Sequence, residues 1–140
     1  MKAKASSVPK LQVKYIHLCD YFTVSSDGKP SIIGEFDRYF TSENQLIINR
    51  AFLVAKLLGE ANKMVDFTIR VRGPKDKDVF NTSFSFPSDV NGVVPFSFQL
   101  SNFVFTDFGM HKFQVLDGDK VLAETELSVE KIAPPRPTSV

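Results

Sequence analysis

Hydrophobic and polar residues alternate along most of this chain with the two-residue period of β-strands. Residues 65–71 place Val, Phe, Ile and Val at odd positions and Asp, Thr and Arg at even positions. The same alternation recurs in residues 80–86, 96–100 and 123–130. Because successive side chains of a strand point to opposite faces, each run predicts a strand with one buried face. The pattern as a whole predicts strands near residues 11–22, 31–40, 46–58, 64–72, 79–86, 93–105, 110–116 and 121–130.

Turn-forming residues separate these runs. Ser26–Pro30 and Gly73–Asp78 each lie between two predicted strands, and Asp117–Lys120 joins the last two. The Asp-Gly pair in the last turn supplies the positive φ that a tight hairpin needs. About eight strands without a long amphipathic helix predict an all-β antiparallel sandwich.

Residues 49–59 fit two interpretations. Asn49 is a good helix cap and Gly59 a good helix stop, so the segment is compatible with a helix. Its apolar residues do not gather on one helical face, however, and the rest of the chain is built from strands. We therefore expect a strand here.

The first predicted strand changes face in its middle. Leu11, Val13 and Tyr15 alternate in one phase, whereas Ile16 and Leu18 follow the other. Either a β-bulge shifts the phase, or the strand is central and covered on both faces.

The length of the chain predicts a single domain, and its charge distribution places basic residues at both ends. The 140 residues predict a basic arm at 1–10, a sandwich domain at 11–131 and a proline-rich disordered tail at 132–140. The net charge is +1, but residues 1–10 and 132–140 hold four basic residues and no acid, which leaves −3 on the remainder. A nucleic-acid partner is therefore not expected.

No apolar run approaches the ~20 residues of a membrane span, and no signal peptide is visible, so we expect a cytoplasmic protein without a membrane partner.

Short motifs near both ends of the predicted domain resemble a known family. Leu18-Cys19-Asp20 is followed by Asp27-Gly28-Lys29 and by Ile33-Gly34-Glu35-Phe36-Asp37. Near the other end stand Gly109, Phe113, Val115, Asp117-Gly118, Leu127 and Val129. In this order the motifs resemble a bacterial family of small, uncharacterised β-sandwich proteins, over most of residues 11–130. The resemblance implies an immunoglobulin-like sandwich and no particular activity.

The densest reactive cluster is His17, Cys19 and Asp20, on the first predicted strand. His17 and Cys19 are two residues apart and project from one face, a possible metal-binding geometry if His111 or a carboxylate joins them. A nucleophilic Cys19–His111 pair is conceivable too, but nothing in the sequence activates the thiol. We favour a core cysteine and a half-buried histidine. Cys19 is the only cysteine, so the chain forms no internal disulfide.

The remaining polar motifs have simpler explanations than ligand binding. Calcium prefers several loop oxygens, but aspartate is also the usual turn residue and no calcium-loop spacing occurs. The aspartates concerned are Asp20, Asp27, Asp37, Asp76, Asp78, Asp117 and Asp119. At the C-terminus, residues 134–137 are compatible with a polyproline helix and residues 138–140 with a carboxylate-capture motif, but a plain disordered tail is favoured. We expect no cofactor and no metal.

Phenylalanine is the unusual residue of this chain. It occurs 14 times, with no tryptophan, and nine of the 14 fall within residues 80–113. Most of them are expected to fill the core. Phe103, Phe105 and Phe108, which lie around a turn, are candidates for an exposed docking patch.

These observations favour a non-enzymatic protein-interaction or regulatory module of a bacterial system. It would present an edge strand or a phenylalanine-rich surface to a protein partner, either alone or as a domain of a larger polypeptide. A metal- or small-ligand-binding sandwich that uses His17, Cys19, His111 or the loop aspartates is the alternative. A hydrolase is a third possibility, which would need a pocket with perturbed titratable groups.

Overall fold

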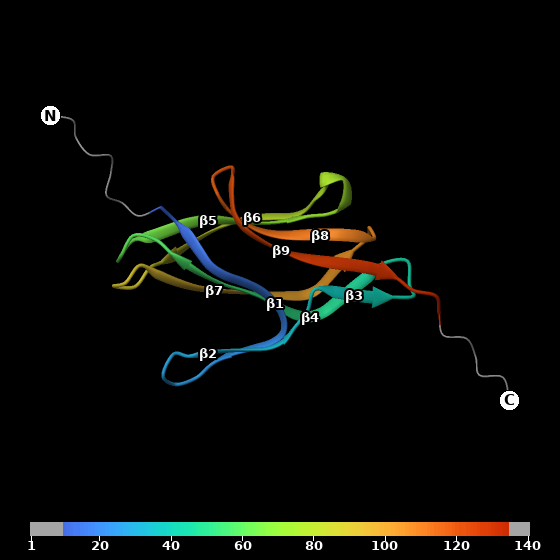
Figure 1. The fold of residues 1–140 in the computed structure, drawn as a ribbon, viewed down its shortest axis with the longest axis horizontal. Helices are drawn as coiled ribbons and strands as arrows, with labels where there is room; N and C mark the ends of the chain where they lie inside the picture. Colours follow the sequence, from blue (N-terminus) through green and yellow to red (C-terminus); the bar gives the residue numbers. More distant parts are fainter. Residues whose placement is uncertain (1–9, 135–140) are drawn as a thin grey trace.

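Two β-sheets packed face to face make up the fold in the computed structural model, which describes residues 10–134 (Figure 1). A single short 3₁₀ turn, η1 (Pro74–Asp76), is the only helical element in this range. No helix among the described residues has the length and apolar character needed to cross a membrane. The strands are β1 (Gln12–Val24), β2 (Pro30–Glu35), β3 (Arg38–Thr41), β4 (Leu46–Leu58), β5 (Met64–Arg72), β6 (Asp78–Pro87), β7 (Val93–Phe105), β8 (Gly109–Asp117) and β9 (Lys120–Lys131).

The two sheets have four and five strands. The order is β2-β1-β4-β7 in the first sheet and β3-β9-β8-β5-β6 in the second. Neighbouring strands are antiparallel except for β3, which runs parallel to the last strand, β9. The predicted all-β, immunoglobulin-like sandwich is confirmed, with nine strands instead of about eight.

The extra strand arises because the predicted strand at 31–40 is divided. Its first part, β2, pairs with β1, whereas its second part, β3, crosses to the other sheet and pairs with β9. Gly34 precedes the division with a φ of +70°. A Cβ at this glycine would lie 2.6 Å from Oδ2 of Asp20, so the close approach of β1 requires glycine here.

Residues 49–59 belong to one continuous strand, so the interpretation as a strand is confirmed. In β4 the inward-facing residues have even numbers up to Ile48 and odd numbers from Ala51 on, so the alternation shifts by one residue in the middle of the strand. The neighbouring strand β7 changes phase at the same level, from Leu100 to Phe103, where Asn102 has a φ of +51°. This shared shift explains why the apolar residues fit neither a helical face nor one strict alternation.

The first strand has both of the features expected as alternatives: it contains a bulge, and it is central in its sheet. The register of β1 against β4 shifts between Val13 and Tyr15, and β1 is central, between β2 and β4. Beyond Cys19, β1 parts from β4, and the β1–β2 hairpin turns back beneath the four-stranded sheet (Figure 1). Leu18 and Cys19 are consequently both buried, one on each face of β1.

The core fills the space between the two sheets. The inward residues of β5, predicted from their alternation, are all buried: Val65, Phe67, Ile69 and Val71. The closing hairpin is also as predicted, because Asp117 pairs with Lys120 across the turn and Gly118 has a φ of +59°. Because the interior is filled, a functional site is to be sought along the sides of the sandwich.

Candidate functional site

One side of the sandwich is bordered by two strands that lack a second neighbour. β6 ends the five-stranded sheet and β7 ends the four-stranded sheet, and no other described strand pairs with their outer edges. Phenylalanine rings bridge the two: Phe98 of β7 lies 5.2 Å from Phe80 and 5.9 Å from Phe84 of β6, between ring centres. The backbone groups along both edges are thus free to bond another chain.

The rings on this side form a continuous cluster, which we call the phenylalanine seam. Its contacts are mostly edge-to-face or tilted, such as Phe84 on Phe96 with ring centres 5.0 Å apart and planes at 63°. Such ring pairs stabilise the fold by more than the burial of their apolar area alone. Phe96 is buried, while Phe86, whose ring centre lies 5.6 Å from that of Phe96, is 36% exposed. The seam comprises Phe80, Phe84, Phe86, Phe96, Phe98 and Phe103.

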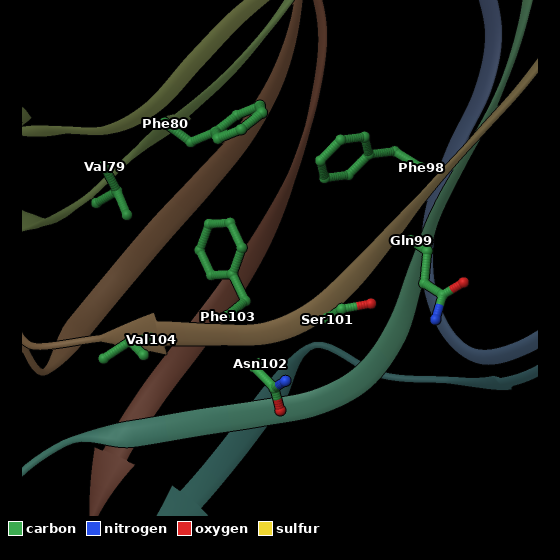
Figure 2. A pocket seen from close by; sticks show the side chains of 8 residues that line it. All are labelled: Val79, Phe80, Phe98, Gln99, Ser101, Asn102, Phe103 and Val104. Carbon is green, nitrogen blue, oxygen red and sulfur yellow. The ribbon is translucent and has the colours of Figure 1, made fainter.

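A hollow of about 370 Å³ opens into the seam. Figure 2 shows the rings of Phe80, Phe98 and Phe103 pointing toward one another, while the amides of Gln99 and Asn102 point away from them. The walls also include Val79 and Val104, and the hydroxyl of Ser101. The hollow therefore has an aromatic interior and neutral polar groups beside it.

The strands that border the seam are nearly free of charge. Residues 79–105 contain one charged residue, Asp89, in 27 positions, although the whole chain has 33 charged residues in 140. Natural edge strands usually carry charges, prolines or bulges, which prevent unwanted pairing. Of these devices, the described strands have Pro95 on β7, Pro87 at the end of β6 and the irregularity at Asn102 of β7. The long edge of β7 is otherwise open to a strand from another chain.

The structure does not place the three phenylalanines of the predicted docking patch together on the surface. Phe103 is half-buried and lines the hollow, and Phe108 is half-buried against the core. Phe105 does not lie on the surface, because the phase change at Asn102 turns it inward, where it is 1% exposed. Sequence reasoning missed Phe80 and Phe98. The signal that could have found them is the loss of charge over residues 79–105.

The predicted cluster on β1 has a structural explanation. The imidazole of His17 bonds the carboxylate of Glu35 through Nδ1 and lies beside the ring of Tyr15, 5.3 Å between centres. Burial raises the pKa of the Cys19 thiol, and the nearby Asp20 and Glu35 carboxylates raise it further, against a backbone hydrogen bond from Tyr21 that lowers it. The protonated thiol of Cys19, which is much less reactive than the thiolate, is therefore favoured.

His111 is in the other sheet, on β8, and does not join this cluster. It is fully buried, and its Nδ1 lies 3.1 Å from the carbonyl oxygen of Gly109. Nε2 has no hydrogen-bond partner. Burial lowers the pKa of His111, and the Gly109 bond and the Asp107 charge oppose this only in part. Among the described residues, no three His, Cys, Asp or Glu side chains are grouped to hold a metal ion.

The predicted aspartates are not gathered at one place: Asp20 lies within β1, and the others are in separate turns or at strand ends. Asp27 accepts a hydrogen bond from the hydroxyl of Ser25, which lowers the pKa of this carboxyl, and it lies 3.4 Å from the ammonium of Lys29. Asp78 accepts from Nε of Arg72 at 3.0 Å. Residues 1–9 of the predicted arm at 1–10 lie outside the described residues. So do residues 135–140, which hold all but the first residue of the motifs predicted at 134–137 and 138–140.

A family of unknown function, DUF6941, matches residues 14–130. The chain belongs to this family. Among solved structures, an immunoglobulin-like protein from Pseudomonas aeruginosa matches 89% of this DUF6941 chain over 99% of its own length, with 12% identity and a TM-score of 0.48. A β-glucosidase from Listeria innocua matches 94% of the DUF6941 chain with 8% identity and a TM-score of 0.50, and the chain spans 18% of that enzyme. At 8% identity the likeness to the second structure shows the fold alone. No curated protein matches the chain.

Proposed function

We propose that this chain is a non-enzymatic protein-binding module and that its partner supplies an extended segment, which pairs with the free edge of β7. The observation that carries the proposal is the nearly uncharged stretch at residues 79–105, which includes all of β7 and all but the first residue of β6. A charged edge would have to lose its hydration when a second strand arrives, whereas β7 carries no charge to desolvate. The edge thus favours strand addition.

Strand addition combines main-chain and side-chain recognition. The backbone of the partner segment would bond the free N–H and C=O groups of β7, and these bonds supply affinity without sequence preference. Alternate side chains of an extended segment point to one face, so every second residue would turn toward the seam. We expect an apolar anchor at one such position to enter the hollow between Phe80, Phe98 and Phe103.

The polar groups beside the hollow would set the register. Ser101 and Asn102 are exposed and lie between the seam residues Phe98 and Phe103 of β7, where the strand changes phase. A hydroxyl and an amide bond neutral polar groups well, and they do so without the cost of burying an ion. The expected partner segment is therefore uncharged, with an apolar residue flanked by small polar ones.

Site-specific photo-crosslinking in cells tests this proposal. A photoreactive phenylalanine analogue replaces Ser101 in one variant, and Ser31 in the matched control. Ser31 is exposed on β2, at the opposite edge of the same sheet. The captured protein is then purified and its affinity for the wild-type chain measured. We expect capture from position 101 only, through an extended, uncharged segment.

Two edge variants decide the outcome with the purified pair. Ser101→Lys places a charge on the proposed edge and is expected to weaken binding at least tenfold. Ser31→Lys places the same charge on the opposite edge and is expected to leave binding within twofold. Equal affinities of the two variants, or a crosslinked partner segment that is helical in the complex, would contradict strand addition at β7.

A further inference from the structure

A second cavity lies away from the seam, beneath the β1–β2 hairpin. Its volume is about 360 Å³, and residues of the hairpin and of the four-stranded sheet line it together. Figure 1 shows this hairpin turning back below the other strands of its sheet. The cavity is lined by the hairpin on one side and by residues of β4 and β7 on the other. This volume is at the lower end of the range of small-molecule sites, about 300–1,000 Å³.

The strand register builds the floor of the cavity. Tyr15 of β1 pairs with Lys56 of β4, and Lys56 pairs with Pro95 of β7, so these three side chains form one row across three strands. Val54 of β4, two residues from Lys56, projects from the same face and also lines the cavity. The floor is therefore an apolar surface with one ammonium group and one phenol.

The hairpin forms an apolar roof. Phe22 pairs with Ile32, and Val24 pairs with Pro30, and three of these four residues line the cavity: Phe22, Val24 and Pro30. The turn beyond them closes on itself, because Ser25 N–H donates to the carbonyl of Lys29 and Gly28 N–H donates to that of Ser25. Val24 remains 54% exposed. The tip thus covers the sheet without packing tightly on it.

The cavity is lined by one charged residue of each sign, Lys56 and Asp89. Lys56 is half-buried and has no carboxylate within ion-pair distance among the described residues. Asp89 lies on another wall, where its Oδ1 accepts the N–H groups of Asn91 and Val93, each at 2.8 Å. The Asp89 carboxylate is therefore engaged in its own loop, whereas Lys56 lacks an anionic partner.

We propose that this cavity binds a small monocarboxylate with an apolar body, of the class of medium-chain fatty acids. The carboxylate pairs with the Lys56 ammonium and accepts a hydrogen bond from the neighbouring Tyr15 hydroxyl. The apolar body lies on Val54, beneath Phe22 and Pro30. A largely apolar cavity with a few convergent polar groups is typical of such sites. This site is separate from the seam and does not depend on protein binding there.

Isothermal titration of the full chain with two probes of equal length, decanoate and decanol, tests the proposal. Lys56→Met retains the apolar stem and removes the charge. It is expected to weaken decanoate binding at least tenfold and to change decanol binding less than twofold. Val24→Trp fills the cavity from an exposed position and is expected to weaken both probes at least tenfold. Lys120→Met, at the exposed start of β9, is the control and leaves both unchanged.

The results separate the site from general adsorption. A wild-type chain that binds neither probe saturably would overturn the proposal. So would a Lys56→Met variant that loses decanoate and decanol equally, because the charge would then have no role. If Val24→Trp fails to fold by circular dichroism, the contrast between the two probes in Lys56→Met still decides.

Discussion

The imidazole of His111 lies edge-on against the ring of Phe105, with ring centres 4.9 Å apart and planes at 79°. Both residues are buried to 1% exposure or less. Phe105 in turn lies 4.9 Å from Phe103, which lines the hollow of the seam. The histidine is thus part of the core behind the seam, where burial and an Nε2 without a hydrogen-bond partner favour the neutral ring.

Stability should decrease at acid pH because of His111. Burial lowers its pKa in the folded state, whereas the unfolded chain binds the proton near pH 6.5. Below that pH the unfolded state therefore holds more protons, and the free energy of unfolding falls until the folded-state pKa is passed. Above pH 7 this contribution is present in full. Urea unfolding of the wild type between pH 7.5 and pH 5 measures the effect.

The variant His111→Leu isolates this contribution from that of the carboxylates. It removes the titrating ring but leaves every acidic residue in place, so the loss of stability between pH 7.5 and pH 5 should be smaller than in the wild type. Identical pH dependence in the two proteins would show that His111 does not titrate differently in the folded state.

Phe105 and Phe103 should differ in their contribution to stability. Phe105 is in the core, so Phe105→Ala should cost about 3–5 kcal/mol, as large-to-small changes of buried phenylalanine do. Phe103 is half-buried at the hollow, and Phe103→Ala should cost about 1–1.5 kcal/mol, roughly half the transfer free energy of a fully buried side chain. Chemical unfolding of both variants measures the difference. Equal losses would mean that the phase change at Asn102 is misplaced.

Gly34 should be less tolerant of a side chain than Gly118. Both have positive φ, which costs an alanine about 1–2 kcal/mol. At Gly34 the new Cβ would also displace the Asp20 carboxylate, whereas no atom lies within 4 Å of the corresponding position at Gly118. Gly34→Ala should therefore lower the melting temperature more than Gly118→Ala.

A double variant tests the cause. If the contact with Asp20 is responsible, Asp20→Ala should relieve part of the loss, so that the double variant Asp20→Ala/Gly34→Ala is more stable than the sum of the single changes predicts. Strict additivity would assign the whole effect to the backbone.

The Cys19 thiol should react slowly while the hairpin covers it. It has no exposed surface, and burial raises its pKa, so both access and thiolate formation are limited. Labelling with a chromogenic disulfide at pH 8 should be about 100-fold slower than in concentrated guanidinium chloride, which corresponds to an opening free energy of about 2.7 kcal/mol. Similar rates in both solutions would mean that the β1–β2 hairpin does not close over β1.

Local alternation was sufficient to predict most of the strands. The predicted bounds of 46–58, 64–72 and 93–105 agree with β4, β5 and β7 because apolar runs and turn residues coincide there. The division of 31–40 was not predictable in this way. Both halves have strand-like sequences, and only the contact between Asp20 and Gly34, residues of different strands, shows where the chain leaves the first sheet.

The candidate site was harder to predict for a related reason. Alternation does not tell whether a phenylalanine faces the centre of the core or its open side, since that depends on which strands end the sheets. Phe98 and Phe105 have similar surroundings in the sequence, yet Phe98 borders the hollow and Phe105 is buried. The cavity beneath the hairpin depends on the position of the β1–β2 hairpin, which follows from no local pattern.

Hydrogen exchange of the complex with the purified partner tests the central claim most directly. If the partner adds a strand to β7, amide exchange should slow in residues 93–105 and remain unchanged in β2, at the other edge of the same sheet. The same measurement on Ser101→Lys should show little protection at equal concentrations. Protection that falls on β2 or β3, with residues 93–105 unchanged, would contradict the account.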